Sequence, residues 1–285
     1  MRTALMVSPH ADDAAAFCGG TLAKLAAEGW KVIIVRVTDD CKDSVGMTLE
    51  STREKNAADF RVAAKILGAA EVIELGYVTD RLADESLVGL RERMVYLFRK
   101  RRPYAVFSFD PYGLWEDNQD HVRVAQAVYE AFWVSAFDLH HPEHFAEGLK
   151  PFSVCERWFF GRELPKVNYV EDVTDFIGKK VEALSSHEAM IKNMLARFIL
   201  QLDTWGRRVK LLEECKSGDH KSLINAFMEE QAKGVAATYH LGEGRMGEAF
   251  RLERFGDLEG LFQLFSEPIE GREPPPKRKG IDGGA

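Results

Sequence analysis

Short apolar runs alternate with segments of helical pattern through the first two-thirds of this 285-residue chain. The runs are rich in β-branched and aromatic residues, and we expect them to be strands at Thr3–Ser8, Lys31–Thr38, Glu71–Leu75, Tyr104–Phe109 and Ser153–Phe160. Apolar strands that alternate with helices form parallel sheets covered on both faces. We therefore predict an α/β fold: a Rossmann-like, doubly wound sheet of strand order 3-2-1-4-5.

The pattern becomes helical after about Thr174. One long amphipathic helix is expected over residues 175–202, with His187 inside it as a packed or solvated residue. We predict a single domain over residues 1–267, with the core sheet in 1–165 and a mainly helical part in 166–267. The tail, 268–285, is rich in Pro, Gly and charge and is expected to be disordered.

Composition limits the partners. The net charge is −7 and the pI about 5.7, which argues against nucleic acid. No apolar stretch reaches 18 residues, and the first apolar run is too short for a signal peptide. The cysteines are scattered, without metal-binding or redox spacing. We expect a cytoplasmic protein that binds neither nucleic acid nor a membrane.

The loop after the first strand carries His10, Asp12 and Asp13. It lacks the glycine fingerprint of dinucleotide sites. One simple interpretation is that an aspartate caps the following helix, a contact worth about 1 kcal/mol. One aspartate is enough for that, so the cap leaves the second unexplained.

A second polar loop follows the fourth strand, with His121 at the start of a helix and Glu116, Asp117 and Asp120 before it. Strands one and four would be neighbours at the topological switch point, where the loops of α/β sheets meet. His10, Asp13 and His121 would then form a two-histidine, one-carboxylate set. Such a set leaves room for water and substrate, as a catalytic zinc requires. Iron, manganese or cobalt could use the same ligands.

These motifs resemble those of the PIG-L/LmbE-type zinc-dependent N-deacetylases. "PHADDA" at residues 9–14 is similar to the family's first motif, Pro/Ala-His-Pro-Asp-Asp-Glu. "NQDHVRVAQAV" at 118–128 is similar to the second, His-Pro-Asp-His at a helix start. "STREKNAADFRVAAKILG", "GYVTDRL" and "MGEAFR" match further segments, so the resemblance spans roughly residues 3–252.

The resemblance implies a zinc-dependent hydrolase that removes acetyl from an N-acetylated amino sugar or a related small glycoconjugate. His10, Asp13 and His121 would hold the metal, and Asp12 would be the general base. Arg53 and Asp80 fall where family members contact substrate. Related enzymes often assemble as trimers or hexamers, so a homo-oligomer is expected as well.

Three positions depart from the family pattern: Ala11, Ala14 and Asn118. Asn118 replaces a histidine; it can donate a hydrogen bond to an oxyanion but cannot deliver a proton. Proton delivery must then come from Asp12 or another group. Asp120 is a possible accessory residue.

Two aromatic residues in the second loop, Tyr112 and Trp115, could form an apolar wall for a sugar ring, although core packing is the default role of aromatic residues.

The segment "HHPEH", His140–His144, also looks like the second motif. It follows the fourth helix instead of a strand, and we expect a connecting loop with no helix after it. We therefore reject it as the metal site. A subordinate possibility is that His141 or His144 folds over the site and supplies the missing imidazole.

Three other functions remain open. An amidase acting on a thiol conjugate or a longer acyl group would differ in the acid that it releases. A non-catalytic sugar-binding protein with the same fold would lack the metal. A nucleotide-binding oxidoreductase is disfavoured by the missing glycine fingerprint.

Overall fold

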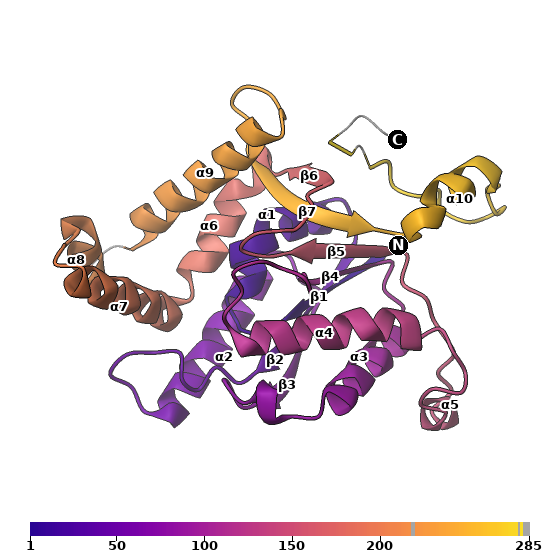
Figure 1. Ribbon diagram of the computed structural model, residues 1–285, viewed down its shortest axis with the longest axis horizontal. Coiled ribbons are helices and arrows are strands. Elements are labelled where there is room, and N and C mark those ends of the chain that lie inside the picture. Colours follow the sequence, from indigo (N-terminus) through magenta and orange to yellow (C-terminus); the bar gives the residue numbers. More distant parts are fainter. Residues whose placement is uncertain (218–219, 279, 282–285) are drawn as a thin grey trace.

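A seven-stranded sheet runs through the computed structural model of the protein, which describes residues 1–217, 220–278 and 280–281 (Figure 1). The strand order is β3-β2-β1-β4-β5-β7-β6. The strands are β1 (Thr3–Ser8), β2 (Lys31–Thr38), β3 (Glu71–Tyr77), β4 (Ala105–Phe109), β5 (Glu156–Phe160), β6 (Tyr169–Asp172) and β7 (Gly247–Glu253). The first five are parallel and contain the predicted 3-2-1-4-5 order.

The sheet does not end at residue 165. β7 pairs antiparallel with β5 and with β6, so two strands of the expected helical part extend the same sheet. β6 has only four residues and shows no long apolar run, which is why the sequence pattern did not indicate it. The fold is therefore mixed, with a parallel core and an antiparallel edge.

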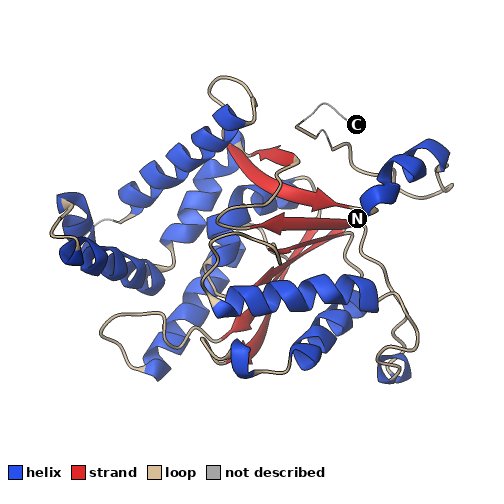
Figure 2. Cartoon of the chain, in the orientation of Figure 1, coloured by secondary structure: helices blue, strands red, loops and turns tan. Residues whose placement is uncertain are grey.

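Helices cover both faces of the sheet (Figure 2). One core packs α1 (Asp13–Ala27) and α2 (Leu49–Ile66) on the sheet, through residues such as Leu22 and Phe60. The other packs α3 (Leu87–Arg101) and α4 (Gln119–Val134), through residues such as Phe98. The remaining α-helices are α5 (Glu143–Ala146), α6 (Ile177–Ser185), α7 (Glu188–Thr204), α8 (Lys210–Ser217), α9 (Lys221–Thr238) and α10 (Glu259–Phe265); short 3₁₀ turns lie at Leu82–Asp84, Thr174–Phe176 and Gly256–Leu258.

The expected long helix is broken. α6 ends at Ser185 and α7 begins at Glu188, so His187 lies in the break and not inside a helix. α6 packs mainly on α1, whereas α7 contacts α2, and the turn between them makes both contacts possible. His187 was expected to be either packed or solvated, and it is fully buried.

α1 is bent one turn after it begins, because Cys18 has a non-helical conformation. The buried carboxylate of Glu248 on β7 accepts hydrogen bonds from the backbone N–H groups of Gly20 and Thr21. A Cβ atom on Gly20 would lie 2.7 Å from the Cβ of Val173, so this position requires glycine. These contacts fix α1, and α1 carries Asp13 in its first turn.

The tail contacts the domain at several points. Glu273 pairs with Arg2 at 2.9 Å, and the Ile281 N–H donates to the Asn168 carbonyl at 3.3 Å. Arg278 is nearly buried and stacks on Trp158, with its guanidinium 3.3 Å from the Glu156 carboxylate. The tail up to this residue has irregular structure; of the segment predicted to be disordered, residues 279 and 282–285 lie outside the described residues. Across the described ranges, no helix combines the length and apolarity needed to span a bilayer.

Candidate metal centre

The loops that follow β1 and β4 meet at the carboxyl ends of these neighbouring strands. The ring centroids of His10 and His121 are 5.1 Å apart, although the residues are far apart in the sequence. The carboxylate of Asp13 reaches the same place, with Oδ1 3.4 Å from Nε2 of His121. Donor atoms 2.0–2.2 Å from one tetrahedral zinc ion lie roughly 3.4 Å from one another. All three side chains are buried.

The first loop is shaped by Asp13 and not by Asp12. The Asp13 carboxylate accepts a 2.7 Å hydrogen bond from the backbone N–H of His10, which folds the loop back onto α1. Asp12 occupies the N-cap position of α1, but its side chain makes no capping hydrogen bond. Helix capping therefore does not explain Asp12, and its carboxylate remains available for chemistry.

Each histidine has a carboxylate at its outer nitrogen. Nδ1 of His10 is 3.0 Å from Oδ1 of Asp40. Nδ1 of His121 is 3.0 Å from Oε2 of Glu116, at ion-pair distance but without the alignment of a hydrogen bond. Metal-binding histidines usually have such a partner, which fixes the tautomer and turns the other nitrogen toward the metal. The arrangement therefore fits Nε2 ligation by both rings.

Another set of possible ligands, His10, Asp40 and Asp43, has one donor atom from each residue within 4.8 Å of the others. Nδ1 of His10 lies 3.0 Å from Asp40 and 3.9 Å from Asp43. The Asp40 carboxylate is already committed there. It accepts hydrogen bonds from the Thr38 hydroxyl, the Ala11 N–H and a guanidinium, besides contacting His10. We therefore regard Asp40 as the residue that orients His10 and not as a ligand.

The site attracts cations. Burial disfavours a charged His10, but the Asp40 hydrogen bond and the charges of Asp13, Asp40 and Asp43 outweigh burial and raise the pKa of His10 to about 10. Burial, and then the charge of Asp13, raises the pKa of Asp12 to about 8. A bound divalent metal ion would reduce the electrostatic repulsion between these crowded carboxylates.

Asn118 and Asp120 lie at the start of α4. Asn118 is its N-cap: Oδ1 accepts from the Asp120 N–H at 2.9 Å, and this leaves Nδ2 3.2 Å from Nε2 of His10. The amide donor thus faces the side of His10 that points into the site. The Asp120 carboxylate accepts from the N–H groups of Asp80 and Leu82, so it holds the loop after β3; its Oδ2 is 3.9 Å from Nε2 of His10.

The two residues expected to contact substrate lie after β2 and β3. Arg53 is half exposed, with Nε 2.8 Å from Oδ2 of Asp39. The side chain of Asp80 is 79% exposed, pairs with Lys42 at 3.3 Å and sits on a left-handed backbone. Both have exposed polar atoms, and their role stays a prediction.

The aromatic residues of the second loop are at the surface. Tyr112 is 59% exposed and Trp115 is 79% exposed. Leu114 of the same loop forms an isolated antiparallel bridge with Glu163 after β5, which ties the two loops together. Core packing, the default role for aromatics, is therefore excluded for Trp115.

The segment His140–His144 does not serve this site. A short helix, α5, begins at Glu143, so the expectation of an uninterrupted loop was wrong. His144 is buried against α3, with Nδ1 3.2 Å from Arg99 and Nε2 2.8 Å from Glu92. α5 lies at the right in Figure 1, whereas the arrow of the parallel strand β5 points left, so α5 and its His144 lie away from the carboxyl ends of the parallel strands. The cation of Arg99 also disfavours a metal at the trio His141, Glu143 and His144.

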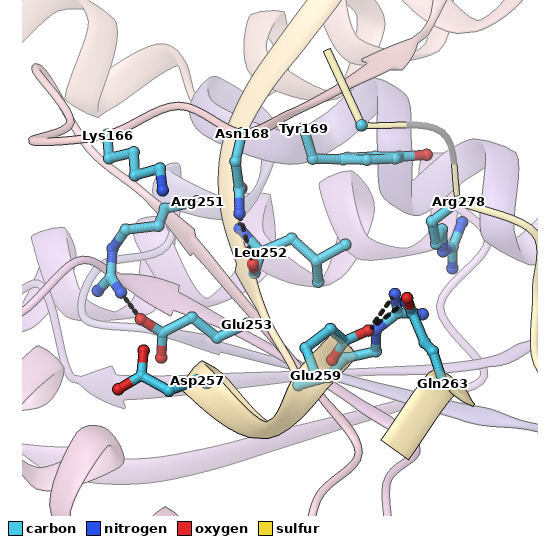
Figure 3. Close-up of a pocket in the computed structure, with 13 residues that line it drawn as sticks. Lys166, Asn168, Tyr169, Arg251, Leu252, Glu253, Asp257, Glu259, Gln263 and Arg278 are labelled. Atoms are coloured by element: carbon cyan, nitrogen blue, oxygen red, sulfur yellow. Dashed lines mark hydrogen bonds and ion pairs between the residues drawn. The ribbon is translucent and has the colours of Figure 1, made fainter. Parts of the chain in front are cut away.

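A hollow of about 500 Å³ lies elsewhere (Figure 3). It lies beside the amino-terminal end of β5, between β7, α10 and the tail, and contains none of the predicted site residues. Its arginines are paired with acids: Arg251 with Glu253, Arg254 with Glu259, and Arg278 with Glu156. We assign no chemistry to it.

Sequence patterns missed Asp40 as the partner of His10, and identified Glu116 only as one acid of a polar loop. A signal existed for Asp40, because two aspartates follow β2 where a single turn residue would suffice. No signal connected Glu116 with the outer nitrogen of His121, since that pairing depends on how the loop folds.

Known proteins resemble this chain in sequence and in fold. A family model described as PIG-L: GlcNAc-PI de-N-acetylase matches residues 5–132. The diacetylchitobiose deacetylase of Thermococcus kodakarensis (strain KOD1) is 28% identical over 194 residues, which cover 66% of this chain and 70% of the relative.

Solved structures share the fold. N,N'-diacetylchitobiose deacetylase from Pyrococcus horikoshii has a TM-score of 0.70 at 22% identity, over 93% of this chain and 86% of that one. GalB, the 4-carboxy-2-hydroxymuconate hydratase of Pseudomonas putida KT2440, has a TM-score of 0.63 at 17% identity, over 96% and 100%. The same fold thus occurs in proteins named for different reactions.

Proposed function

We propose that the chain, whose residues 5–132 match the PIG-L family model, is a metal-dependent N-deacetylase acting on an N-acetylated amino sugar or a related small glycoconjugate. One observation carries the proposal. Two imidazoles and one carboxylate from distant loops converge, and each imidazole has a carboxylate at its outer nitrogen. Zinc suits this donor set, and other divalent transition metals could use it.

The proposed ligands are Nε2 of His10, Nε2 of His121 and the carboxylate of Asp13. A metal ion held there would supply a Lewis acid, which polarises an amide carbonyl and makes water more acidic at neutral pH. The histidine partners Asp40 and Glu116 would keep the ring nitrogens in place for it.

Asp12 is the proposed general base. It lies beside the proposed ligand Asp13 and makes no capping bond, so its ionised carboxylate can take a proton from the attacking water. Burial raises the pKa of this carboxyl, which makes the carboxylate a stronger base. General-base assistance contributes roughly 10²- to 10⁴-fold. Protonated Asp12 can then pass the proton to the leaving nitrogen, yielding acetate and a free amine.

Asn118 is the proposed donor to the oxyanion. Its Nδ2 faces the site beside His10, and an amide N–H can stabilise negative charge as it develops on the carbonyl oxygen. Since the amide does not titrate, the proton for the amine is left to Asp12 in this proposal.

Four residues from the loops and helix near the candidate metal centre are proposed to select the substrate. Arg53 and Asp80 offer charged groups for sugar hydroxyls, and Tyr112 and Trp115 offer exposed aromatic faces. The name of the archaeal relative supports an N-acetylated amino sugar, since it is a diacetylchitobiose deacetylase.

A screen for free amine tests this function. Purified zinc-loaded protein is incubated with N-acetylated amino sugars, their N-acyl analogues of longer chain, and thiol-conjugate amides, and both amine and released acid are measured. We expect equal amounts of amine and acetate from at least one amino sugar. His144→Ala, which changes a residue away from the site, should leave this activity intact. Release of longer acids without acetate would support the amidase alternative. Sugar binding without release of amine would show that the protein is not a deacetylase.

A further inference from the structure

Strand β2 has the sequence KVIIVRVT. Apart from the lysine at its start, Arg36 is its one charged residue. The side chain is only 4% exposed, in a central strand between Ser8 of β1 and Glu74 of β3. An arginine is costly to bury unless its charge is paired. Building the strand does not require it, so another role is expected.

The Arg36 guanidinium bridges two carboxylates. Nη1 is 3.1 Å from Oδ2 of Asp40, and Nη2 contacts Glu74. The group also lies over the ring of Phe60, at 5.4 Å from its centroid. A planar fork can hold two acids at once in this way, whereas a lysine ammonium is a single point charge.

The Asp40 carboxylate connects Arg36 to the His10 ring. One carboxylate oxygen contacts Arg36 and the Ala11 N–H, and the other contacts the Thr38 hydroxyl and Nδ1 of His10. The backbone of Asp40 is left-handed, with φ of 51°, and its carbonyl accepts from the Asn56 amide at 2.9 Å. With four contacts, the carboxylate cannot rotate without losing at least one of them.

We propose that Arg36 is a positioning residue for the metal centre, acting through Asp40 to hold His10 with Nε2 directed at the ion. This inference rests on the proposed function. In this proposal Arg36 acts through Asp40 and is not itself a ligand of the metal.

The other histidine provides a matched control. Glu116, the partner of His121, also has an arginine neighbour, Arg162, at 3.4 Å. The Arg162 side chain is 44% exposed, however, and an exposed ion pair is weakened by solvent. Arg36 and Arg162 are thus the same residue type in equivalent places, one buried and one exposed.

Metal binding to Arg36→Met, Arg162→Met, Asp40→Asn and the double variant Arg36→Met/Asp40→Asn tests the proposal. Zinc affinity is measured by competition with a chelator, and the cobalt-substituted proteins are compared by their visible absorption spectra. We expect Arg36→Met to weaken zinc binding about 10- to 100-fold and to change the cobalt spectrum, as loss of an outer partner does. Arg162→Met should stay within about twofold.

The double variant separates positioning from general destabilisation. If Arg36 acts only through Asp40, the double variant binds zinc no more weakly than Asp40→Asn alone. Additive losses, or an Arg36→Met protein with wild-type affinity and spectrum, would overturn the proposal. Should Arg36→Met fail to fold, Arg36→Lys is measured instead; it keeps the charge but lacks the fork, and a spectrum and affinity equal to wild type would also overturn it. A wild-type protein that binds no metal would remove the proposed function together with this inference, whereas normal binding unaffected by Arg36 removes this inference alone.

Discussion

Adjacent aspartates do different work in this site. Asp13 closes the loop onto the His10 N–H and directs its other oxygen toward His121. Asp12 has the cap position without the cap bond and is half-buried, and desolvation raises its pKa to about 8. From the sequence, Asp12 could be either a helix-capping residue or a residue with a chemical role. Its side chain makes no capping hydrogen bond, so it is not a capping residue.

Asp12→Asn should separate stability from turnover. Because no cap bond is lost, and because burial opposes the charged form of Asp12, the variant should be at least as stable as the wild type at neutral pH. Turnover should fall by roughly 10²- to 10⁴-fold, since the amide cannot accept a proton, while metal content stays normal. Kinetics, urea unfolding and metal analysis on one preparation check this. Near-normal turnover would remove Asp12 as the base.

Elements were predictable where one physical pattern dominated. The five apolar runs of the parallel core appear as strands, because burial on both faces leaves a continuous apolar signature. Strand β6 was not predicted, because it is short and polar at its end. The break at His187 was not predicted, because the apolar spacing of α6 continues into α7. The meeting of the two loops followed from strand order, but the partners Asp40 and Glu116 depend on loop geometry, which periodicity does not encode.

The break between α6 and α7 should make stability depend on pH. Burial lowers the pKa of His187 to about 4 from its ordinary 6.5, so below pH 6.5 the unfolded chain takes up a proton that the folded chain refuses. Stability is therefore lost as the pH falls from 6.5 toward 4. Between pH 7 and 5, the wild type should lose about 2 kcal/mol more than His187→Met.

Unfolding in urea at each pH measures this difference. His240→Asn is the control, because it changes an exposed histidine whose left-handed backbone asparagine tolerates. Its pH profile should follow the wild type. Parallel profiles for His187→Met and the wild type would show that His187 is not the titrating group.

At the scale of the molecule, the two ends of the parallel strands have different tasks. The carboxyl ends carry the candidate metal centre, and the amino ends are closed by the tail. Arg278 enters between aromatic rings and neutralises Glu156, which is fully buried. The tail predicted to be disordered from composition thus has a specific contact, which composition cannot show.

Removing the Arg278 side chain should destabilise the whole fold. In Arg278→Ala, the Trp158 N–H is the one hydrogen-bond partner that the described residues still offer the buried Glu156 carboxylate, and breaking a buried pair costs about 3 kcal/mol or more. Lys277→Ala, at the exposed neighbouring position, should change the free energy of unfolding by less than about 0.5 kcal/mol. Equal stabilities of the two variants in urea unfolding would show that the tail contact carries no free energy.

If two distant loops hold one metal ion through His10, Asp13 and His121, the zinc content of the protein should depend on His121. Zinc is measured after dialysis on the wild type, His121→Ala and His144→Ala. We expect about one ion per chain in the wild type and in His144→Ala, and almost none in His121→Ala. Full occupancy in His121→Ala together with loss in His144→Ala would show that the ion is held elsewhere.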